Sequence, residues 1–166
     1  MTILEELLEA WRYTRESVIE EVENLPEKRL QKPPEGLVHS VLDLSKHIVD
    51  AGRLMAGELA RADGDFQRKP VPELIEEHTA GDTRPGSRAD AISLLRRSHE
   101  EGEAAIRDAG EIHMLQRIRQ FDGTHATRLS WMQHGISHEE YHRGQLALYA
   151  RLFGVTPALT KKIQGG

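Results

Sequence analysis

Four stretches of the chain place apolar residues three to four positions apart, which is the spacing of an amphipathic helix. They run over residues 2–24, from Ser40 to the stop at Asp63-Gly64, from Ser87 to Gly110, and from Thr127 to Phe153. In the first stretch the repeating apolar positions are Leu4, Leu7, Leu8, Trp11, Val18, Val22 and Leu25. Ser and Thr are favoured at helix N-caps, and Gly at helix ends, so the boundaries agree with the spacing. The pattern therefore predicts four helices.

Long connections separate these helices. The loop after residue 24 is rich in helix-breaking residues, namely Pro26, Pro33, Pro34 and Gly36. Segment 63–87 also contains several prolines and glycines, and Pro72 is suited to begin a short helix within it. Segment 111–126 is irregular, and no stretch alternates with a period of two. We therefore expect an all-α fold, a four-helix bundle formed by a single domain over residues 1–166, with long connections after its first three helices.

Composition narrows the classes of function. Charged residues make up 30% of the chain and hydrophobic residues 38%, as in a globular protein. The net charge of −5 and the interspersed charges exclude the basic footprint of a nucleic-acid binder. No stretch suits a membrane span or a signal peptide, so we expect neither a nucleic-acid nor a membrane partner. The absence of cysteine excludes disulfides and cysteine nucleophiles, and it fits a cytoplasmic location.

Several of the nine histidines fall on apolar helix faces, and three of them form a candidate group. A rotation of about 100° per residue places His138 and His142 in the same stripe of the last helix as Trp131 and Tyr149. The same rotation places His47 on the inward face of the second helix. Because a buried imidazole needs partners for both ring nitrogens, three that converge on one core are best satisfied by a shared ion. We therefore predict His47, His138 and His142 as metal ligands.

Other residues near these histidines are candidates for supporting roles. Gln145 lies on the same face one turn beyond His142 and is placed to hydrogen-bond a ligand or a bound water. Glu139 lies at the flank of the stripe and is a candidate acceptor or proton shuttle. His99, on the inward face of the third helix, and His134, one turn before the pair, are reserve ligands. Segments 63–87 and 111–126 are predicted to supply the walls of the pocket.

The string from His138 to His142 also matches the H-E-x-x-H motif of zinc proteases, with Glu139 as general base. That interpretation is disfavoured because none of the 24 residues that follow is His, Asp or Glu, so no third ligand lies downstream. An all-helical chain also offers no strand to hold an extended peptide substrate.

The remaining features have simpler explanations. Four histidines lie in loops or at helix ends and need no functional role: His39, His78, His113 and His125. Glu58 suits a packing or capping role. A second apolar stripe on the last helix indicates either a fully buried central helix or a dimer interface. It consists of Leu129, Met132, Ile136 and Ala147.

The sequence resembles the DinB-like metalloprotein superfamily. The resemblance rests on Leu44-Ser45-Lys46-His47 in the second helix and on HEEYHRGQL followed by FGVTP near the C-terminus. It implies a four-helix bundle, often dimeric, that holds one divalent metal ion through His47, His138 and His142. Characterised members include thiol transferases that use bacillithiol or mycothiol, and a thiol-dependent maleylpyruvate isomerase.

The leading functional hypothesis is therefore a metal-dependent S-transferase that conjugates a low-molecular-weight thiol to a small electrophile. The missing cysteines agree with it, because any thiol must then come from a cosubstrate. One alternative is a metal-dependent hydrolase with water as the nucleophile. Another is a non-enzymatic metal-binding stress or interaction protein. We expect one zinc or nickel ion per chain and a homodimer.

Overall fold

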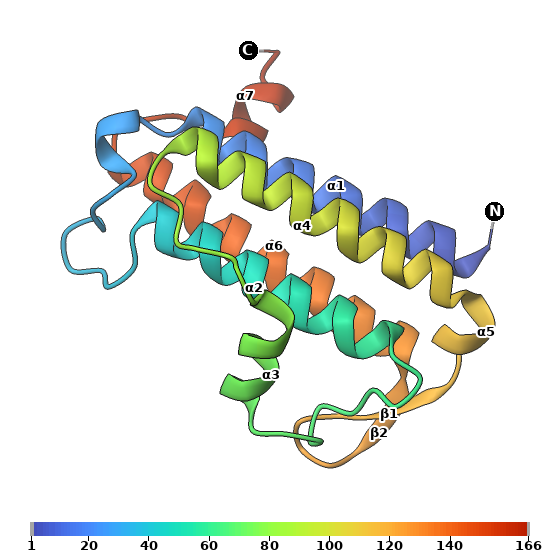
Figure 1. Cartoon of the computed structure of the whole chain (residues 1–166). Helices are drawn as coiled ribbons and strands as arrows, with labels where there is room; N and C mark the ends of the chain where they lie inside the picture. Colours follow the sequence, from blue (N-terminus) through green and yellow to red (C-terminus); the bar gives the residue numbers. More distant parts are fainter. Residues whose placement is uncertain (1, 166) are drawn as a thin grey trace.

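The computed structural model describes residues 2–165 and contains four long helices packed as a bundle (Figure 1). They are α1 (Ile3–Asn24), α2 (Val41–Ala60), α4 (Arg88–Ala109) and α6 (Arg128–Leu152). Each begins at a Ser or Thr N-cap whose hydroxyl accepts a hydrogen bond from the backbone N–H three residues later. These caps are Thr2, Ser40, Ser87 and Thr127. The predicted bundle of four helices is confirmed.

Short elements fill the connections. A 3-10 helix (Glu27–Arg29) follows α1, and α3 (Val71–Thr79) follows α2, with Pro72 in its first turn as predicted. After α4 come α5 (Glu111–Met114) and a hairpin of β1 (Arg117–Arg119) and β2 (His125–Thr127). The last helix, α7 (Ala158–Ile163), follows α6.

The hairpin corrects the expectation that segment 111–126 is irregular. Its strands pair antiparallel with Ile118 opposite Ala126, and Gly123 adopts φ +83° between them. Strands of three residues are too short to produce a recognisable alternation of apolar and polar positions. The chain is mostly helical, with this one small sheet within residues 2–165.

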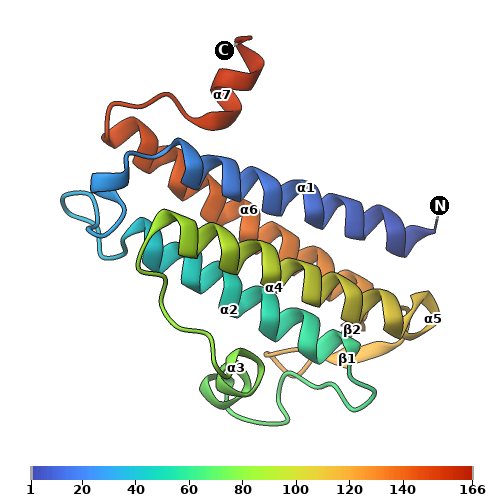
Figure 2. The ribbon, with the colours of Figure 1, turned by 45° about the horizontal axis from the view of Figure 1, so that its top comes forward.

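The arrangement of the helices explains the longest connection. Helix α1 packs against α4 and α6, and α2 packs against the same two helices. The sequence colours show that α2 runs parallel to α4, and α1 parallel to α6 (Figures 1 and 2). A parallel neighbour requires the chain to return along the bundle, and the 20 residues of α2 span about 30 Å. The segment that contains α3 makes this return.

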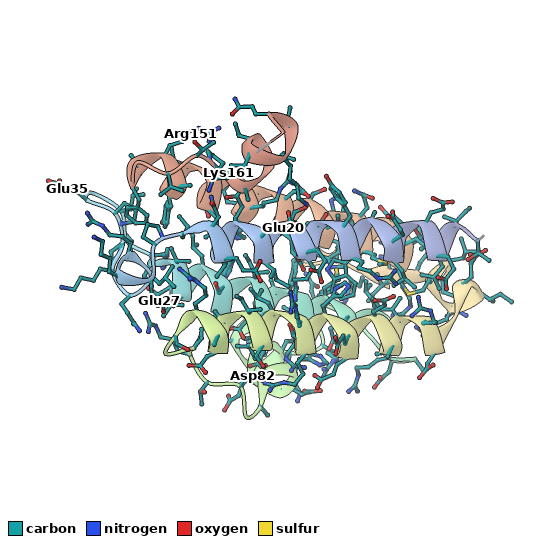
Figure 3. The ribbon with its side chains drawn as sticks, turned by 90° about the horizontal axis from the view of Figure 1, so that it is seen from above. Glu20, Glu27, Glu35, Asp82, Arg151 and Lys161 are labelled. Carbon is teal, nitrogen blue, oxygen red and sulfur yellow. The ribbon has the colours of Figure 1, made fainter. Side chains whose placement is uncertain are left out.

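Ion pairs fasten the peripheral segments to the bundle, and Figure 3 labels several of the residues involved. Asp82, in the return segment, pairs with Arg53 of α2 at 2.5 Å and with Arg97 of α4 at 3.3 Å. Lys161 of α7 donates to the Asn24 side chain at 2.6 Å, and the neighbouring Lys162 pairs with Glu20. The return segment and α7 are thus held against the long helices.

The buried face of α6 differs from the predicted one. The sequence places the inward stripe around His138. In the structure Met132, Ile136 and Leu146 are buried, whereas His138 is half-buried. Because α6 packs between α1 and α2, the second apolar stripe faces the core, and the histidine stripe follows the edge of the α2–α6 groove. Burial within the bundle therefore accounts for most of the second stripe without a dimer interface. Within residues 2–165, no helix is both long and apolar enough to cross a membrane.

Candidate metal centre

Helices α2 and α6 bring three histidines together. The Nε2 atom of His138 lies 3.3 Å from Nε2 of His47 and 3.1 Å from Nε2 of His142. One ring nitrogen from each of the three lies within 4.8 Å of the others, so His47, His138 and His142 form a group that could hold a metal ion. The spacing of four residues on α6 aligns two of the rings, and the antiparallel contact with α2 adds the third.

The donor set fits a divalent transition-metal ion, because imidazole nitrogens bind zinc, copper, iron and nickel. Two imidazole nitrogens bound at about 2.0–2.1 Å in tetrahedral geometry are separated by roughly 3.3 Å, close to the two Nε2 separations observed. Burial and the neighbouring His142 and His47 rings lower the pKa of His138 to about 4. Burial, followed by the His142 ring, also lowers the pKa of His47. Both rings are therefore neutral at pH 7, which is the form that binds metal.

Gln145 fixes the tautomer of His142. Nδ1 of His142 donates to Oε1 of Gln145 at 2.6 Å, and the Gln145 amide nitrogen donates to the Tyr141 hydroxyl at 3.4 Å. Because an amide oxygen only accepts hydrogen bonds, Nδ1 carries the proton and Nε2 keeps its lone pair facing the other two histidines. The structure thus places Gln145 where it orients a candidate ligand.

The cluster lies at the surface of the bundle rather than in its core, which corrects the expectation that all three histidines point inward. His142 is buried, His138 is half-buried, and His47 is exposed. The reason is that the stripe with Met132 and Ile136 faces the core of the bundle, which leaves the histidine stripe of α6 at the edge of the α2–α6 groove. If the three histidines bind an ion, their position at an open edge leaves room for a further ligand from outside, as in catalytic zinc sites.

Glu139 points away from the histidines and serves the bundle interior. Its carboxylate accepts from Trp11 Nε1 at 2.7 Å and from Arg15 at 2.6 and 2.9 Å. Arg15 also donates to the Leu95 carbonyl and the Ser98 hydroxyl. All of Arg15, Trp11 and Glu139 are essentially inaccessible to solvent. Glu139 thus joins α6 to α1, and Arg15 extends the link to α4. With both carboxylate oxygens engaged, Glu139 does not provide a free base.

The reserve ligands lie outside the three-histidine group. The His99 ring packs edge-on against Trp11, with the ring centroids 4.4 Å apart. Neither nitrogen of the His99 ring has a hydrogen-bond partner within residues 2–165. Burial, and then the charge of Arg15, lowers the His99 pKa to about 4, so this ring is neutral. His134 is exposed, and its ring lies edge-on to that of Trp131 with the centroids 5.3 Å apart.

His78 and His113, for which the sequence indicates no function, make structural contacts. Nε2 of His78 contacts the Glu58 carboxylate at 2.6 Å, and Glu58 is completely buried. Glu58 also accepts from Arg68 and from the Asp65 backbone, so it anchors the segment after α2, in agreement with the predicted capping role. Nε2 of His113 hydrogen-bonds the Leu59 carbonyl at 2.8 Å. Sequence spacing gives no sign of these long-range contacts.

Pockets open on two sides of the histidine cluster. One, of about 280 Å³, borders His138 and is mainly apolar. It includes Phe66 and Phe121, so the predicted contribution of segments 63–87 and 111–126 to the pocket walls is confirmed. The other, of about 650 Å³, borders His47 and His142 and is rich in polar side chains. These include His39, Asp43, Lys46, Asp50, Arg84 and Tyr141. The individual aromatic residues of the first pocket were not identified from the sequence.

Replacing Gln145 with leucine is expected to weaken metal binding by about 10–100-fold, because His142 loses the acceptor that fixes its tautomer. The measurement is competition for zinc against a chelator of known affinity. Gln133→Leu, an equivalent change at an exposed position of α6, is the matched control and should bind as the unmodified chain does. Equal affinity of the two variants would rule out the orienting role of Gln145.

Comparisons with known proteins agree with this fold. A family model described as the DinB superfamily matches residues 10–146. The DinB-like protein YjoA from Bacillus subtilis superposes with a TM-score of 0.67 at 22% identity, over 91% of this chain and 93% of that one. YfiT from Bacillus subtilis is described as a probable metal-dependent hydrolase with an unusual four-helix bundle topology. It superposes with a TM-score of 0.71 at 13% identity, over 94% of this chain and 91% of that one. A comparison with curated proteins gives no match.

Proposed function

Because the chain belongs to the DinB superfamily, we propose that it is a metal-dependent S-transferase that joins a low-molecular-weight thiol to a small electrophile. The observation that carries the proposal is the position of the three histidines between an apolar and a polar pocket. Such a site can receive two different substrates, one from each side. The chain itself has no cysteine, so the thiol is a cosubstrate.

Each residue of the site has a defined task in this proposal. His47, His138 and His142 hold one zinc or nickel ion, and Gln145 keeps Nε2 of His142 directed at it. A divalent ion held by neutral imidazoles lowers the pKa of a thiol or water bound to it. The polar pocket offers the charged Lys46 and Arg84 to a polar thiol, although each already pairs with an aspartate. The apolar pocket receives the electrophile.

Thiol conjugation tests the proposal directly. The protein is purified without added metal, its metal content is measured, and conjugation of cysteine to 1-chloro-2,4-dinitrobenzene is followed before and after chelation. We expect chelation to lower the rate by on the order of 100-fold or more, and zinc or nickel to restore it. Metal-free protein that conjugates as fast as metal-loaded protein would contradict the transferase assignment.

A metal-dependent hydrolase is the second candidate. Exposure of His47 opens the cluster to water, and the description of YfiT, a structure of similar fold, names this class of activity. Turnover of a 4-nitrophenyl ester that needs metal but no added thiol would favour the hydrolase. Conjugation that needs both metal and thiol would favour the transferase.

A purely structural ion, the non-enzymatic alternative, has less support. The middle of the bundle is held by the Arg15–Glu139 pair, whereas the histidines lie at the edge of one groove. An ion there would join only two of the four long helices. Loss of thermal stability on chelation, without any change in turnover, would favour this alternative.

A further inference from the structure

The apolar pocket beside His138 has an aromatic wall built from three separate segments. Phe66 follows α2, Phe121 lies in the β1–β2 turn, and Trp131 lies in the first turn of α6. The ring centroids of Phe66 and Phe121 are 4.8 Å apart, as are those of Phe66 and Trp131, and those of Phe121 and Trp131 are 5.4 Å apart. Three rings converge here in a chain of which only 5% is aromatic.

Backbone and ionic contacts hold this wall in place. The backbone N–H of Phe66 donates to the Arg119 carbonyl at 3.1 Å, and the Gln67 side chain donates to the Phe121 carbonyl at 2.8 Å. Asp65 and Arg119 form an ion pair at 2.7 Å. The loop after α2 and the hairpin are therefore joined on both sides of the aromatic residues, so the pocket is formed before any substrate binds.

Small residues keep the opposite side of the pocket open. Ala51 of α2 and Gly135 of α6 line it next to His138. A Cβ atom at position 135 would lie 2.0 Å from Sδ of Met55, so only glycine allows the Met55 side chain to occupy its present place. Met55 and Leu54 complete the apolar lining. Glu139 also borders the pocket, but its charge is compensated by Arg15.

The volume suits one substituted ring. An engineered apolar cavity of about 150 Å³ in another protein binds benzene, and this pocket measures about 280 Å³. Aromatic rings contact one another favourably at centroid separations of about 4.5–7 Å. The partly exposed rings of Phe121 and Trp131 can make such a contact with a fourth ring, whereas Phe66 is buried behind them. Phe121 is 40% exposed although it is a large apolar side chain, so its outer face can cover a bound group.

We propose that this pocket binds an aromatic ring of the electrophilic substrate and that Phe121 and Trp131, packed on the buried Phe66, determine this specificity. The ring lies between the aromatic wall and His138, which places its substituent next to the three-histidine cluster. The polar pocket on the other side of the cluster carries two tyrosines, Tyr141 and Tyr149, but also the charged Lys46 and Arg84, so the thiol is placed there and the aromatic substrate on the opposite side. This inference rests on the proposed function for its substrate, but binding alone tests it.

The binding test compares benzyl alcohol with ethanol, which share a hydroxyl group and differ in the ring. Calorimetry with the purified metal-loaded protein should give a dissociation constant in the millimolar range for benzyl alcohol, at least about 10-fold lower than for ethanol. Ala51→Leu, which fills the pocket, should weaken the binding of benzyl alcohol at least about 10-fold. Phe121→Ala, which removes an exposed part of the wall, should weaken it about 3–10-fold.

Controls separate pocket effects from misfolding. Ala104→Leu makes the same change at an exposed position of α4 and should bind benzyl alcohol as the unmodified chain does. Metal content and melting temperature are measured for every variant. Equal binding of benzyl alcohol and ethanol to the unmodified protein, or unchanged binding in both pocket variants, would overturn the proposal.

A selectivity measurement links the pocket to turnover. In Ala51→Leu, kcat/KM for 1-chloro-2,4-dinitrobenzene should fall at least about 10-fold relative to kcat/KM for iodoacetamide, which has no ring. A general loss of stability would lower both values together. If benzyl alcohol binds as expected but no metal-dependent turnover occurs, the pocket assignment holds and the proposed function fails. If turnover occurs with an unchanged ratio, the pocket assignment fails and the function holds.

Discussion

Replacing His138 with alanine is expected to reduce bound metal from one ion per chain to less than about a tenth of that value. His138 is the ring whose Nε2 approaches both other Nε2 atoms, at 3.1 and 3.3 Å. Without it, His47 and His142 remain as two ligands on different helices. Since changes around a metal ligand already cost 10–100-fold in affinity, loss of a ligand should cost at least about 100-fold. Elemental analysis after dialysis against a fixed zinc or nickel concentration measures the effect.

The matched control is His134→Ala, which removes an exposed imidazole one turn earlier on α6. Because His134 lies outside the three-histidine group, this variant should keep its full metal content. Stoichiometric metal in His138→Ala would refute the assignment of the site. Loss of metal in His134→Ala alone would transfer the ligand role to the reserve histidine.

Replacing Arg15 with methionine is expected to lower the free energy of unfolding by about 3–5 kcal/mol. Arg15 and Glu139 are each about 1% exposed, and the variant leaves the Glu139 carboxylate buried without its cation. Urea unfolding followed by circular dichroism gives the value. Arg12→Met, on the same helix, is the control, because Arg12 is exposed and its partner Glu103 retains Arg107; the change should cost less than about 1 kcal/mol.

A double variant shows whether the loss comes from the unpaired charge. Arg15→Met combined with Glu139→Met removes both ions and should recover a large part of the lost stability, since an apolar pair of similar size can replace a buried ion pair. If Arg15→Met costs no more than Arg12→Met, the ion pair does not hold the centre of the bundle. A double variant less stable than Arg15→Met would show that the charge of Glu139 is not the cause.

The helices were predictable because their signals are local. Ser40 and Thr127 cap their helices through hydrogen bonds to residues three positions away. The spacing of apolar residues that marks a helix also lies within that helix alone. The grouping of His47 with the His138 and His142 pair also followed from helix faces, and the structure brings these three rings together. Whether they bind metal remains a prediction.

The rest depends on which helices become neighbours. Helix α6 has apolar residues on more than one side, so its own sequence cannot say which side meets α1 and which meets α2. The partners of Glu139 lie 124 and 128 positions away, at Arg15 and Trp11. The aromatic wall likewise joins Phe66 to Phe121 through contacts between two loops. Such pairings are set by the tertiary arrangement, and they produce no periodic pattern in the sequence.

The order of the helices in the bundle also affects how the protein is made on the ribosome. Helix α1 is synthesised first, but its parallel neighbour α6 begins roughly 100 residues later. At 5–20 residues per second, α1 waits on the order of 5–20 s for that neighbour. During this interval α6 is not available to cover the face of α1 that carries Trp11, and α4 becomes available only after residues 88–109 have been made. The apolar face of α1 therefore stays open to aggregation and to chaperone capture until α6 emerges.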